Sequence, residues 1–338
     1  MTHHADYQAA IRKGVTWLLT EQHPDGGFSA PHEGIDSFYK IPYVFGVTGH
    51  VSAAQRLLDW VARYCFTAEG DLRSPDCKSQ GDFHREFYTY ANSWLVIGCQ
   101  RLGRFDLAYR GLEFILRFQD ARSGGFFAEP EFVTAGRGRQ DIVCASQAGL
   151  ACLYLGRLEA ARRAGEFLLK LIELQPEPQR RLYASLDPVE GLITHYPEDK
   201  ALRHVVDTAR PAQWYFYPGI AMGFLGQLYR ATGDQRYLEA ADWYFAFTTR
   251  CQGDVYRTPP SGKIGWGASL LYAITGEPRY RQVAEAVGDY LVDFQQPGGW
   301  WQPLAFDPAQ RYGLHDYTAE FVAWLSEICQ NLRRDSTP

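Results

Sequence analysis

Two short segments of this 338-residue chain place a histidine next to or near a carboxylic acid, and both residue types can move protons. His84 and Glu86 lie at the start of one apolar stretch, and His315 and Asp316 at the start of another. A carboxyl group or an imidazole held in a pocket can protonate or deprotonate an organic molecule, so we predict that these four residues are catalytic. The structural alternative is that they cap the helices that follow, since Asp is a favoured N-cap residue.

Aromatic and polar residues in the same parts of the chain could bind the substrate. The chain has 21 Tyr, 20 Phe and 9 Trp, and such rings fill cores but also line pockets for organic ligands. Lys40 is the hardest to explain structurally, because a lysine in a mostly apolar helix needs a partner or a ligand. Asp141 could instead be a helix cap, and several of the rings could be core residues. The predicted substrate-binding residues are Lys40, Tyr88, Tyr90, Asp141, His195, Trp214, Tyr217, Trp266, Trp300 and Tyr317.

No metal-binding or cofactor-binding motif is visible. The nine histidines are dispersed, the seven cysteines include no Cys-x-x-Cys pair, and the P-loop and dinucleotide fingerprints are absent. We therefore expect no metal and no cofactor, and a small molecule as the substrate. The sequence leaves the oligomeric state open.

Charge and hydropathy exclude other classes of partner. A net charge of −5 without a basic stripe argues against nucleic acid, and no apolar run is long enough to span a bilayer. The odd number and irregular spacing of the cysteines are typical of free thiols in a reducing compartment, and no signal peptide opens the chain. We therefore expect a cytoplasmic protein.

The candidate residues must be positioned by a series of helices. Apolar residues recur at helical spacing, and Gly or Pro ends most of the segments. Short turns built on Leu-Gly-Arg or Thr-Gly-acid alternate with long connections that carry most of the candidates. The twelve predicted helices cover about residues 5–21, 37–48, 51–67, 85–102, part of 110–126, 140–155, 159–174, 212–231, 235–249, 264–274, 280–295 and 317–332.

This alternation predicts an all-α fold, a closed (α/α)6 toroid that spans residues 1–338 as a single domain. Odd-numbered helices would form the outer ring and even-numbered helices the inner ring. The long connections would then meet at one mouth, at the N-termini of the inner helices, which favour acidic ligand groups. An open superhelix of helical repeats is the alternative. Within the longest connection, residues 182–184 and 192–194 could form a short hairpin.

Three units of the chain repeat one pattern. In each, Gly is followed after eight residues by Gln and then by a Gly-Gly-aromatic turn. The Gln amide can bond backbone groups left open at a helix C-terminus, so the unit has a structural explanation. The Gly and Gln positions are Gly14 and Gln22, Gly111 and Gln119, and Gly288 and Gln296.

This unit resembles the QW repeat of squalene cyclases and their relatives, although two copies end in Phe and the third lacks the basic residue before its Gly. The resemblance implies the toroid superfamily of terpenoid cyclases and protein prenyltransferases. It covers the repeat framework along most of the chain. The Asp-x-Asp-Asp motif with which squalene cyclases protonate alkenes is absent, and so is an Asp-x-Cys zinc site of the prenyltransferase kind.

The main functional hypothesis is therefore a cofactor-independent cyclase or isomerase that acts by acid–base chemistry on a largely apolar small molecule, such as a terpenoid or polyketide intermediate. The alternative is a carbohydrate-active (α/α)6 enzyme, because the phrase LYRATGDQRYLEAA is similar to segments of sugar epimerases and unsaturated-uronyl hydrolases. A non-enzymatic, partner-binding toroid is a third reading. The lumen distinguishes the first two: an apolar cavity favours a cyclase, and one rich in hydrogen-bonding groups favours a sugar enzyme.

Overall fold

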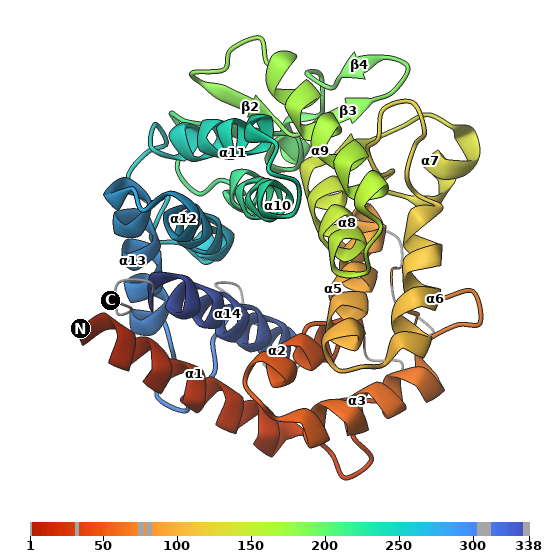
Figure 1. Cartoon of the computed structure of the whole chain (residues 1–338), viewed down its shortest axis with the longest axis vertical. Helices are drawn as coiled ribbons and strands as arrows, with labels where there is room; N and C mark the ends of the chain where they lie inside the picture. The colour runs from red at the N-terminus through yellow and green to blue at the C-terminus, as the bar shows by residue number, and fades with distance from the viewer. Residues whose placement is uncertain (1, 31–33, 74–77, 79–82, 303–311, 334–338) are drawn as a thin grey trace.

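The computed structural model describes residues 2–30, 34–73, 78, 83–302 and 312–333. Its helices form two concentric rings, which confirms the predicted all-α (α/α)6 toroid (Figure 1). The outer ring consists of α1 (Thr2–Glu21), α3 (Val51–Tyr64), α6 (Phe105–Leu116), α9 (Leu158–Glu173), α11 (Gln235–Thr248) and α13 (Pro278–Asp293). The inner ring consists of α2 (Ile41–Val47), α5 (Tyr88–Arg101), α8 (Ile142–Tyr154), α10 (Phe216–Thr232), α12 (Gly262–Thr275) and α14 (Tyr312–Asn331).

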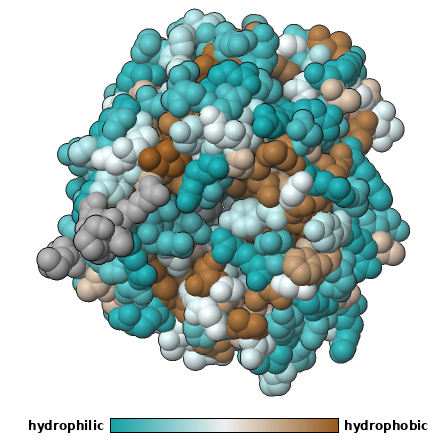
Figure 2. All heavy atoms as spheres, in the orientation of Figure 1, coloured by the Kyte–Doolittle hydropathy of each residue, from teal (hydrophilic) through white to brown (hydrophobic). Residues whose placement is uncertain are grey.

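The distribution of apolar residues explains which ring each helix joins. Outer helix α9 buries Ala161, Leu168 and Leu171 on one face and turns polar residues outward. Inner helix α8 is buried along nearly its whole length. An amphipathic helix fits a surface position and a helix that is apolar all round fits a buried one. Hydrophilic residues accordingly cover most of the outer rim in Figure 2.

The ring is closed. Each inner helix packs against the next in chain order, and α14 packs against α2 again. Outer helix α1 lies against α13 and α14, so the two ends of the chain meet (Figure 1). The open superhelix is therefore excluded.

The connections contain elements that the sequence pattern did not predict. Two short helices, α4 (Phe83–Glu86) and α7 (Pro130–Ala135), lie before inner helices, as do the 3₁₀ turns η1 (Ile35–Ser37), η2 (Glu198–Arg203) and η3 (Pro259–Ser261). The predicted second helix therefore starts only at Ile41. Residues of the longest connection form small sheets, in which the predicted segments 182–184 and 192–194 do not pair with each other. Strand β2 (Arg181–Tyr183) pairs with β5 (Val205–Asp207), and β3 (Ser185–Asp187) lies between β1 (Gln140–Asp141) and β4 (Gly191–Leu192).

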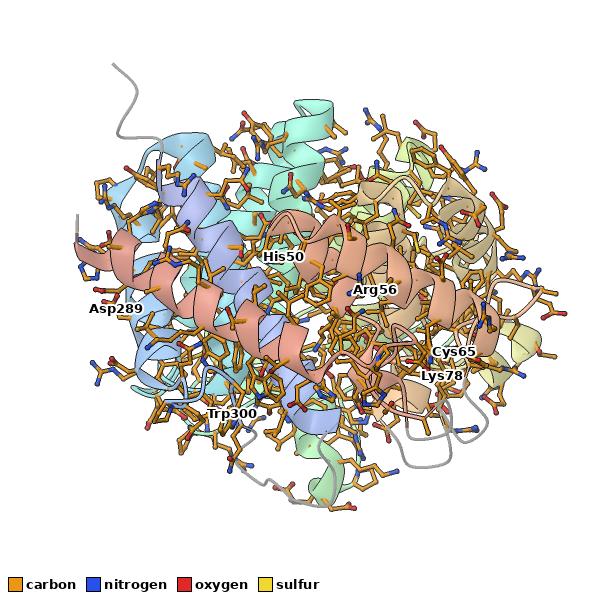
Figure 3. All side chains as sticks on the ribbon, turned by 90° about the horizontal axis from the view of Figure 1, so that it is seen from below. His50, Arg56, Cys65, Lys78, Asp289 and Trp300 are labelled. Carbon is orange, nitrogen blue, oxygen red and sulfur yellow. The ribbon has the colours of Figure 1, made fainter. Side chains whose placement is uncertain are left out.

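Short and long connections lie at opposite ends of the ring. Gly233 ends α10 with φ of 70°, a left-handed conformation that glycine adopts at little cost. In the side view of Figure 3, His50 marks a short connection. Lys78 and Trp300 mark long connections and lie closer to the lower edge of the molecule. The N-termini of the inner helices therefore meet where the long connections meet, as predicted.

The repeated units join neighbouring outer helices. Gln22 Nε2 donates to the carbonyl of Gly26, in its own turn, and to that of Ala53, in α3, at 3.0 Å each. The guanidinium of Arg56, labelled in Figure 3, donates in turn to Gln22 Oε1 at 2.9 Å. Gln119 forms the equivalent bonds between α6 and α9. The units therefore fasten one outer helix to the next.

The third unit closes the ring, but with a different glutamine from the predicted one. Gln295 Nε2 donates to Gly299 O at 2.8 Å and to Ala10 O of α1 at 2.9 Å. The predicted Gln296 only reaches the carbonyl of Phe294, at 3.5 Å. The spacing in this unit is one residue shorter than in the other two, and the sequence pattern alone did not show this.

Two further expectations concern the cysteines and the membrane. The described cysteines are free thiols, namely Cys65, Cys99, Cys144, Cys152, Cys251 and Cys329, while Cys77 lies outside the described residues. Among the described helices, none combines the length and the apolar character that crossing a bilayer requires.

Candidate active site

A cavity of about 380 Å³ lies at the end of the ring where the long connections meet. Its walls come from the first turns of α5, α12 and α14 and from segments that precede α2, α5 and α10. This volume is in the range of small-molecule sites. Its charged or titratable residues are Asp36, Lys40, His84, Lys263, Asp316 and Glu320, and its aromatic residues include Tyr39, Phe83, Tyr90, Trp214, Phe216 and Tyr317.

Two lysines and two carboxylates form a continuous network along one wall. Lys40 Nζ donates to the carboxylates of Asp316, at 2.9 Å, and of Glu320. Glu320 also accepts hydrogen bonds from Lys263 and, at 3.1 Å, from Trp324 Nε1. Both lysines are buried. Because a buried ammonium group without a partner is very unfavourable, the carboxylates are what allow these lysines to line the cavity.

Burial and ion pairing act in opposite directions on the pKa values of these groups. Burial lowers the pKa of Lys40, but the adjacent carboxylates raise it more, so that this lysine stays charged; Lys263 behaves in the same way. Burial raises the pKa of Glu320, but the two lysines lower it more, so it stays ionised. The pKa of Asp316 is raised instead, because burial outweighs the effect of Lys40. Asp316 is therefore the best candidate for carrying a proton.

A histidine–carboxylate pair lies across from this network. His84 Nε2, on α4, is 2.6 Å from Asp36 Oδ1, on η1. Burial raises the pKa of Asp36, but His84 and Lys40 lower it more, so the net pKa is below its ordinary value. An ionised carboxylate beside an imidazole fixes the orientation of the ring and stabilises its protonated form. The pair could therefore accept a proton from a substrate.

Aromatic rings cover much of the remaining wall. Tyr90 lies near both lysines, with its ring centroid 6.0 Å from Lys40 Nζ and 5.6 Å from Lys263 Nζ. Trp214, which is partly buried, has its ring 5.3 Å from that of Phe216. Rings next to convergent hydrogen-bonding groups suit a ligand with both apolar and hydroxylated faces.

The structure brings part of the predicted site together. The predicted residues that line the cavity are His84, Asp316, Lys40, Tyr90, Trp214 and Tyr317. They come from four separate parts of the chain, and they gather because the ring closes.

Two predicted catalytic residues lie elsewhere. The ring of His315 packs against Trp17, at 5.4 Å, and Phe28, at 5.3 Å, and its Nδ1 is 3.2 Å from Ser37 Oγ. Glu86 forms an ion pair with Arg203 at 2.6 Å. Neither residue is part of the cavity wall.

Three predicted binding residues have structural partners outside the cavity. Asp141 caps α8 by accepting a bond from Cys144 N at 2.8 Å, which is the structural alternative given above. Tyr88 donates to Asp71 at 2.8 Å, in a buried cluster on the outer side of α5. Tyr217 donates to the carbonyl of Arg203 at 2.8 Å.

The remaining predicted binding residues also lie away from the cavity. The ring of Trp266 stacks on Trp324 at 5.0 Å, below the charged network. Trp300 lies 6.0 Å from Trp17, near α1. His195 lines a separate groove in the longest connection, where its Nδ1 is 3.1 Å from Thr194 Oγ1.

Several cavity residues were not among the predicted catalytic or binding residues, and those with polar side chains are Asp36, Tyr39, Lys263 and Glu320. A signal for Glu320 existed, because residues four apart lie on the same face of a helix and Asp316 was already a candidate. Lys263 occupies the first turn of its inner helix, a position similar to that of Lys40 before α2. The sequence offers no comparable signal for Asp36.

Within the described residues, no cluster of three or more His, Cys, Asp or Glu side chains is arranged to hold a metal ion.

No protein-family model matches the chain, and no curated protein matches it in sequence.

Solved structures share the fold over almost the whole chain. A D-mannose isomerase superposes with a TM-score of 0.69 and 10% identity, covering 96% of this chain and 97% of its own. A GH76 α-mannanase from Bacteroides thetaiotaomicron superposes with a TM-score of 0.65 and 14% identity, covering 97% and 96%. A sugar epimerase from a ruminal bacterium gives 0.63 and 12%, covering 95% and 98%. At these identities the similarity establishes the (α/α)6 fold alone.

These comparisons correct the main functional hypothesis. The three similar structures named above are carbohydrate-active enzymes and support the alternative hypothesis over a terpenoid cyclase. The cavity agrees with the correction, because its wall carries six titratable side chains where a cyclase for apolar substrates needs an apolar lining. The repeat resemblance led to the correct ring architecture but to the wrong class of substrate.

Proposed function

We propose that this protein is a sugar isomerase or epimerase that moves a proton to and from the carbon atom next to a carbonyl group. The observation that carries this proposal is the composition of the cavity wall. A histidine–carboxylate pair, a carboxylic acid of raised pKa and two buried ammonium groups surround one space.

The charge of the wall favours proton transfer. Removing a proton next to a carbonyl group places negative charge on oxygen, which nearby ammonium groups stabilise. The pKa values of Lys40 and Lys263 are raised, so both keep their charge. The N-termini of the inner helices add partial positive charge at the same end of the ring.

Each group then has a role in the proposed reaction. His84, oriented by Asp36, takes the proton from carbon. Asp316, whose pKa is raised by burial, gives a proton to the carbonyl oxygen, and the lysines stabilise the enediolate between the two transfers. In an isomerase the carbon-bound proton returns to the neighbouring carbon, and Asp316 takes the proton of the hydroxyl group that becomes the new carbonyl. In an epimerase the proton is returned to the opposite face of the same carbon, and Asp316 takes back the proton that it gave to the oxygen.

The pairing of charges favours a neutral sugar. Lys40 and Lys263 already share the carboxylates of Asp316 and Glu320, so no cation in this network is left for a substrate carboxylate or phosphate. Trp214 and Tyr317 offer ring faces to the apolar side of a sugar, and the charged groups offer both donors and acceptors to its hydroxyls. The named activities of the similar structures, mannose isomerase and sugar epimerase, support this class of substrate.

Solvent proton exchange tests the proposal. The protein is incubated in D₂O with a panel of neutral aldoses, ketoses and disaccharides, and NMR follows deuterium entering at the carbon next to the anomeric centre. We expect exchange with at least one sugar, a fall of about 10²-fold or more in His84→Gln, and no change in the matched control His50→Gln. Absence of exchange with every sugar, or release of new reducing ends from a disaccharide without exchange, would overturn the proposal.

A further inference from the structure

The segment before α10 brings Trp214 to the cavity through an unusual backbone conformation. Ala212 has φ of 54°, and among the described non-glycine residues only Lys78 shares a positive φ. A residue with a Cβ atom adopts this left-handed region only at a cost, and such residues persist where surrounding contacts hold them. Ala212 lies two residues before Trp214, so its conformation determines where the indole points.

A single carboxylate holds this segment on both sides of Trp214. Asp254, in the connection between α11 and α12, accepts a hydrogen bond from the backbone N–H of Ala212 at 2.8 Å through Oδ2. Its other oxygen, Oδ1, accepts a bond from the hydroxyl of Tyr215, also at 2.8 Å. Tyr215 is fully buried, so the second bond anchors the carboxylate to the core. The two bonds fix the residues that flank Trp214.

The result is an indole seated among other rings at the cavity. The centroid of Trp214 lies 5.3 Å from that of Phe216, and 6.4 Å from those of Phe83 and Phe87. Three of these residues, Phe83, Trp214 and Phe216, line the cavity. Asp254 does not line the cavity and reaches it only through this segment.

We propose that Asp254 is a positioning residue, which holds Ala212 in the left-handed conformation so that Trp214 forms a fixed wall for the substrate. That the substrate is a sugar rests on the function proposed above, but the positioning of Trp214 does not. The alternative is that Asp254 only stabilises the surface connection, without effect on the indole.

Three variants separate these explanations. Asp254→Ala removes both acceptors. Asp254→Asn can keep both contacts, because the amide oxygen accepts from the Ala212 N–H and the amide nitrogen can donate to Tyr215 Oη. Asp254→Ala combined with Ala212→Gly removes the carboxylate but makes the left-handed conformation readily accessible, since glycine has no Cβ. Ala212→Gly alone is the control.

The first readout needs no ligand. Acrylamide quenching of Trp214 fluorescence is taken as the difference between each variant and the same variant carrying Trp214→Phe, because the chain has nine tryptophans. We expect quenching to rise clearly in Asp254→Ala, and to return most of the way to the wild-type value in Asp254→Asn and in the double variant. Unchanged quenching in Asp254→Ala, or no recovery in the double variant, would overturn the proposal.

The second readout uses the sugar identified by solvent exchange. Asp254→Ala should raise KM by about tenfold with a smaller effect on kcat, and the double variant should recover most of this loss. If no sugar reacts with the wild type, the proposed function fails, while the quenching result still decides the role of Asp254.

Discussion

Glu320 is the residue on which the charged wall of the cavity depends. It is shared by the ammonium groups of Lys40 and Lys263 and accepts a further bond from Trp324 in the layer below. Without its charge, Lys263 loses its carboxylate and Lys40 keeps only that of Asp316. The residue therefore links the reactive groups to the aromatic layer beneath them.

Replacing Glu320 with Gln should lower the free energy of unfolding by about 3 kcal/mol, the usual cost of removing one partner of a buried ion pair. Urea denaturation at neutral pH measures the change. Glu159→Gln is the matched control, since that side chain is 88% exposed. Equal stability of the two variants would show that the lysines do not need this carboxylate.

The same residue gives a prediction about pH. The pKa of Glu320 in the folded protein lies below its ordinary value of 4.5. A carboxylate of this kind contributes stability above its unfolded-state pKa and loses that contribution as the pH falls through its folded-state pKa. The stability difference between wild type and Glu320→Gln should therefore be complete above about pH 5 and shrink on acidification. A difference that stays constant in urea titrations at decreasing pH would contradict the pKa shift.

Helix geometry explains which candidate residues could be predicted at this scale. Successive residues on a helix point about 100° apart, so a cavity on one side of α14 is lined by some neighbouring pairs and not by others. Asp316 faces it, and His315 turns toward Trp17. The sequence placed its candidates in connections that precede the inner helices, and several of these candidates line the cavity. It could not choose between neighbours, because the rotation of each helix is set by packing.

At the scale of the helices, the glutamines of the repeated units hold neighbouring outer helices together through hydrogen bonds. Gln119 donates to Gly124 O in its own turn and to Ala160 O at the start of α9, and accepts a bond from Arg163. One side chain therefore stabilises the turn that follows α6 and also binds that turn to α9. The equivalent bonds of Gln22 and Gln295 form the same joint between α1 and α3 and between α13 and α1.

Gln119→Ala should destabilise the protein by about 2 kcal/mol, because two backbone carbonyls and one guanidinium lose their partner together. Thermal and urea denaturation measure the effect, and Gln235→Ala, at an exposed position at the start of α11, is the control. A loss no larger than that of the control would mean that water replaces the amide in this joint.

The assignment of the helices to the two rings was predictable because short connections alternate with long ones along the chain. The small sheets were not, because β2 pairs with β5 across more than twenty residues and no local pattern specifies that partner. The one-residue shift from Gln296 to Gln295 was missed for a similar reason. Spacing along the chain does not show which amide reaches the carbonyl of α1.

At the level of the whole molecule, closure depends on contacts between the two ends of the chain. Gln295 bonds to Ala10, Tyr7 donates to Asp289 at 2.8 Å, and Arg333 donates to His4 at 3.2 Å. A Cβ atom at Gly288 would lie 2.6 Å from Tyr7, so α13 and α1 approach as closely as glycine permits.

Deleting residues 1–21 should therefore abolish cooperative unfolding, because it removes one outer helix and exposes the apolar faces of α13 and α14. A circular permutant tests whether closure or connectivity matters. It joins the two termini through a flexible linker and begins at Asp234, in a short connection. We expect the permutant to unfold in one transition near the wild-type midpoint in urea. Cooperative unfolding of the deletion variant would show that the ring does not need its first helix.

The shared position of Glu320 between Lys40 and Lys263 also bears on how the protein is synthesised. Lys40 directly precedes the first inner helix and Lys263 lies at the start of the fifth, while their carboxylates lie on the sixth. A nascent chain emerges N-terminus first, so Lys40 is synthesised long before the carboxylates of Asp316 and Glu320 that accompany it into the core. Stable compaction around the lumen must then wait for α14, because the charges of both lysines are balanced only when that helix is in place.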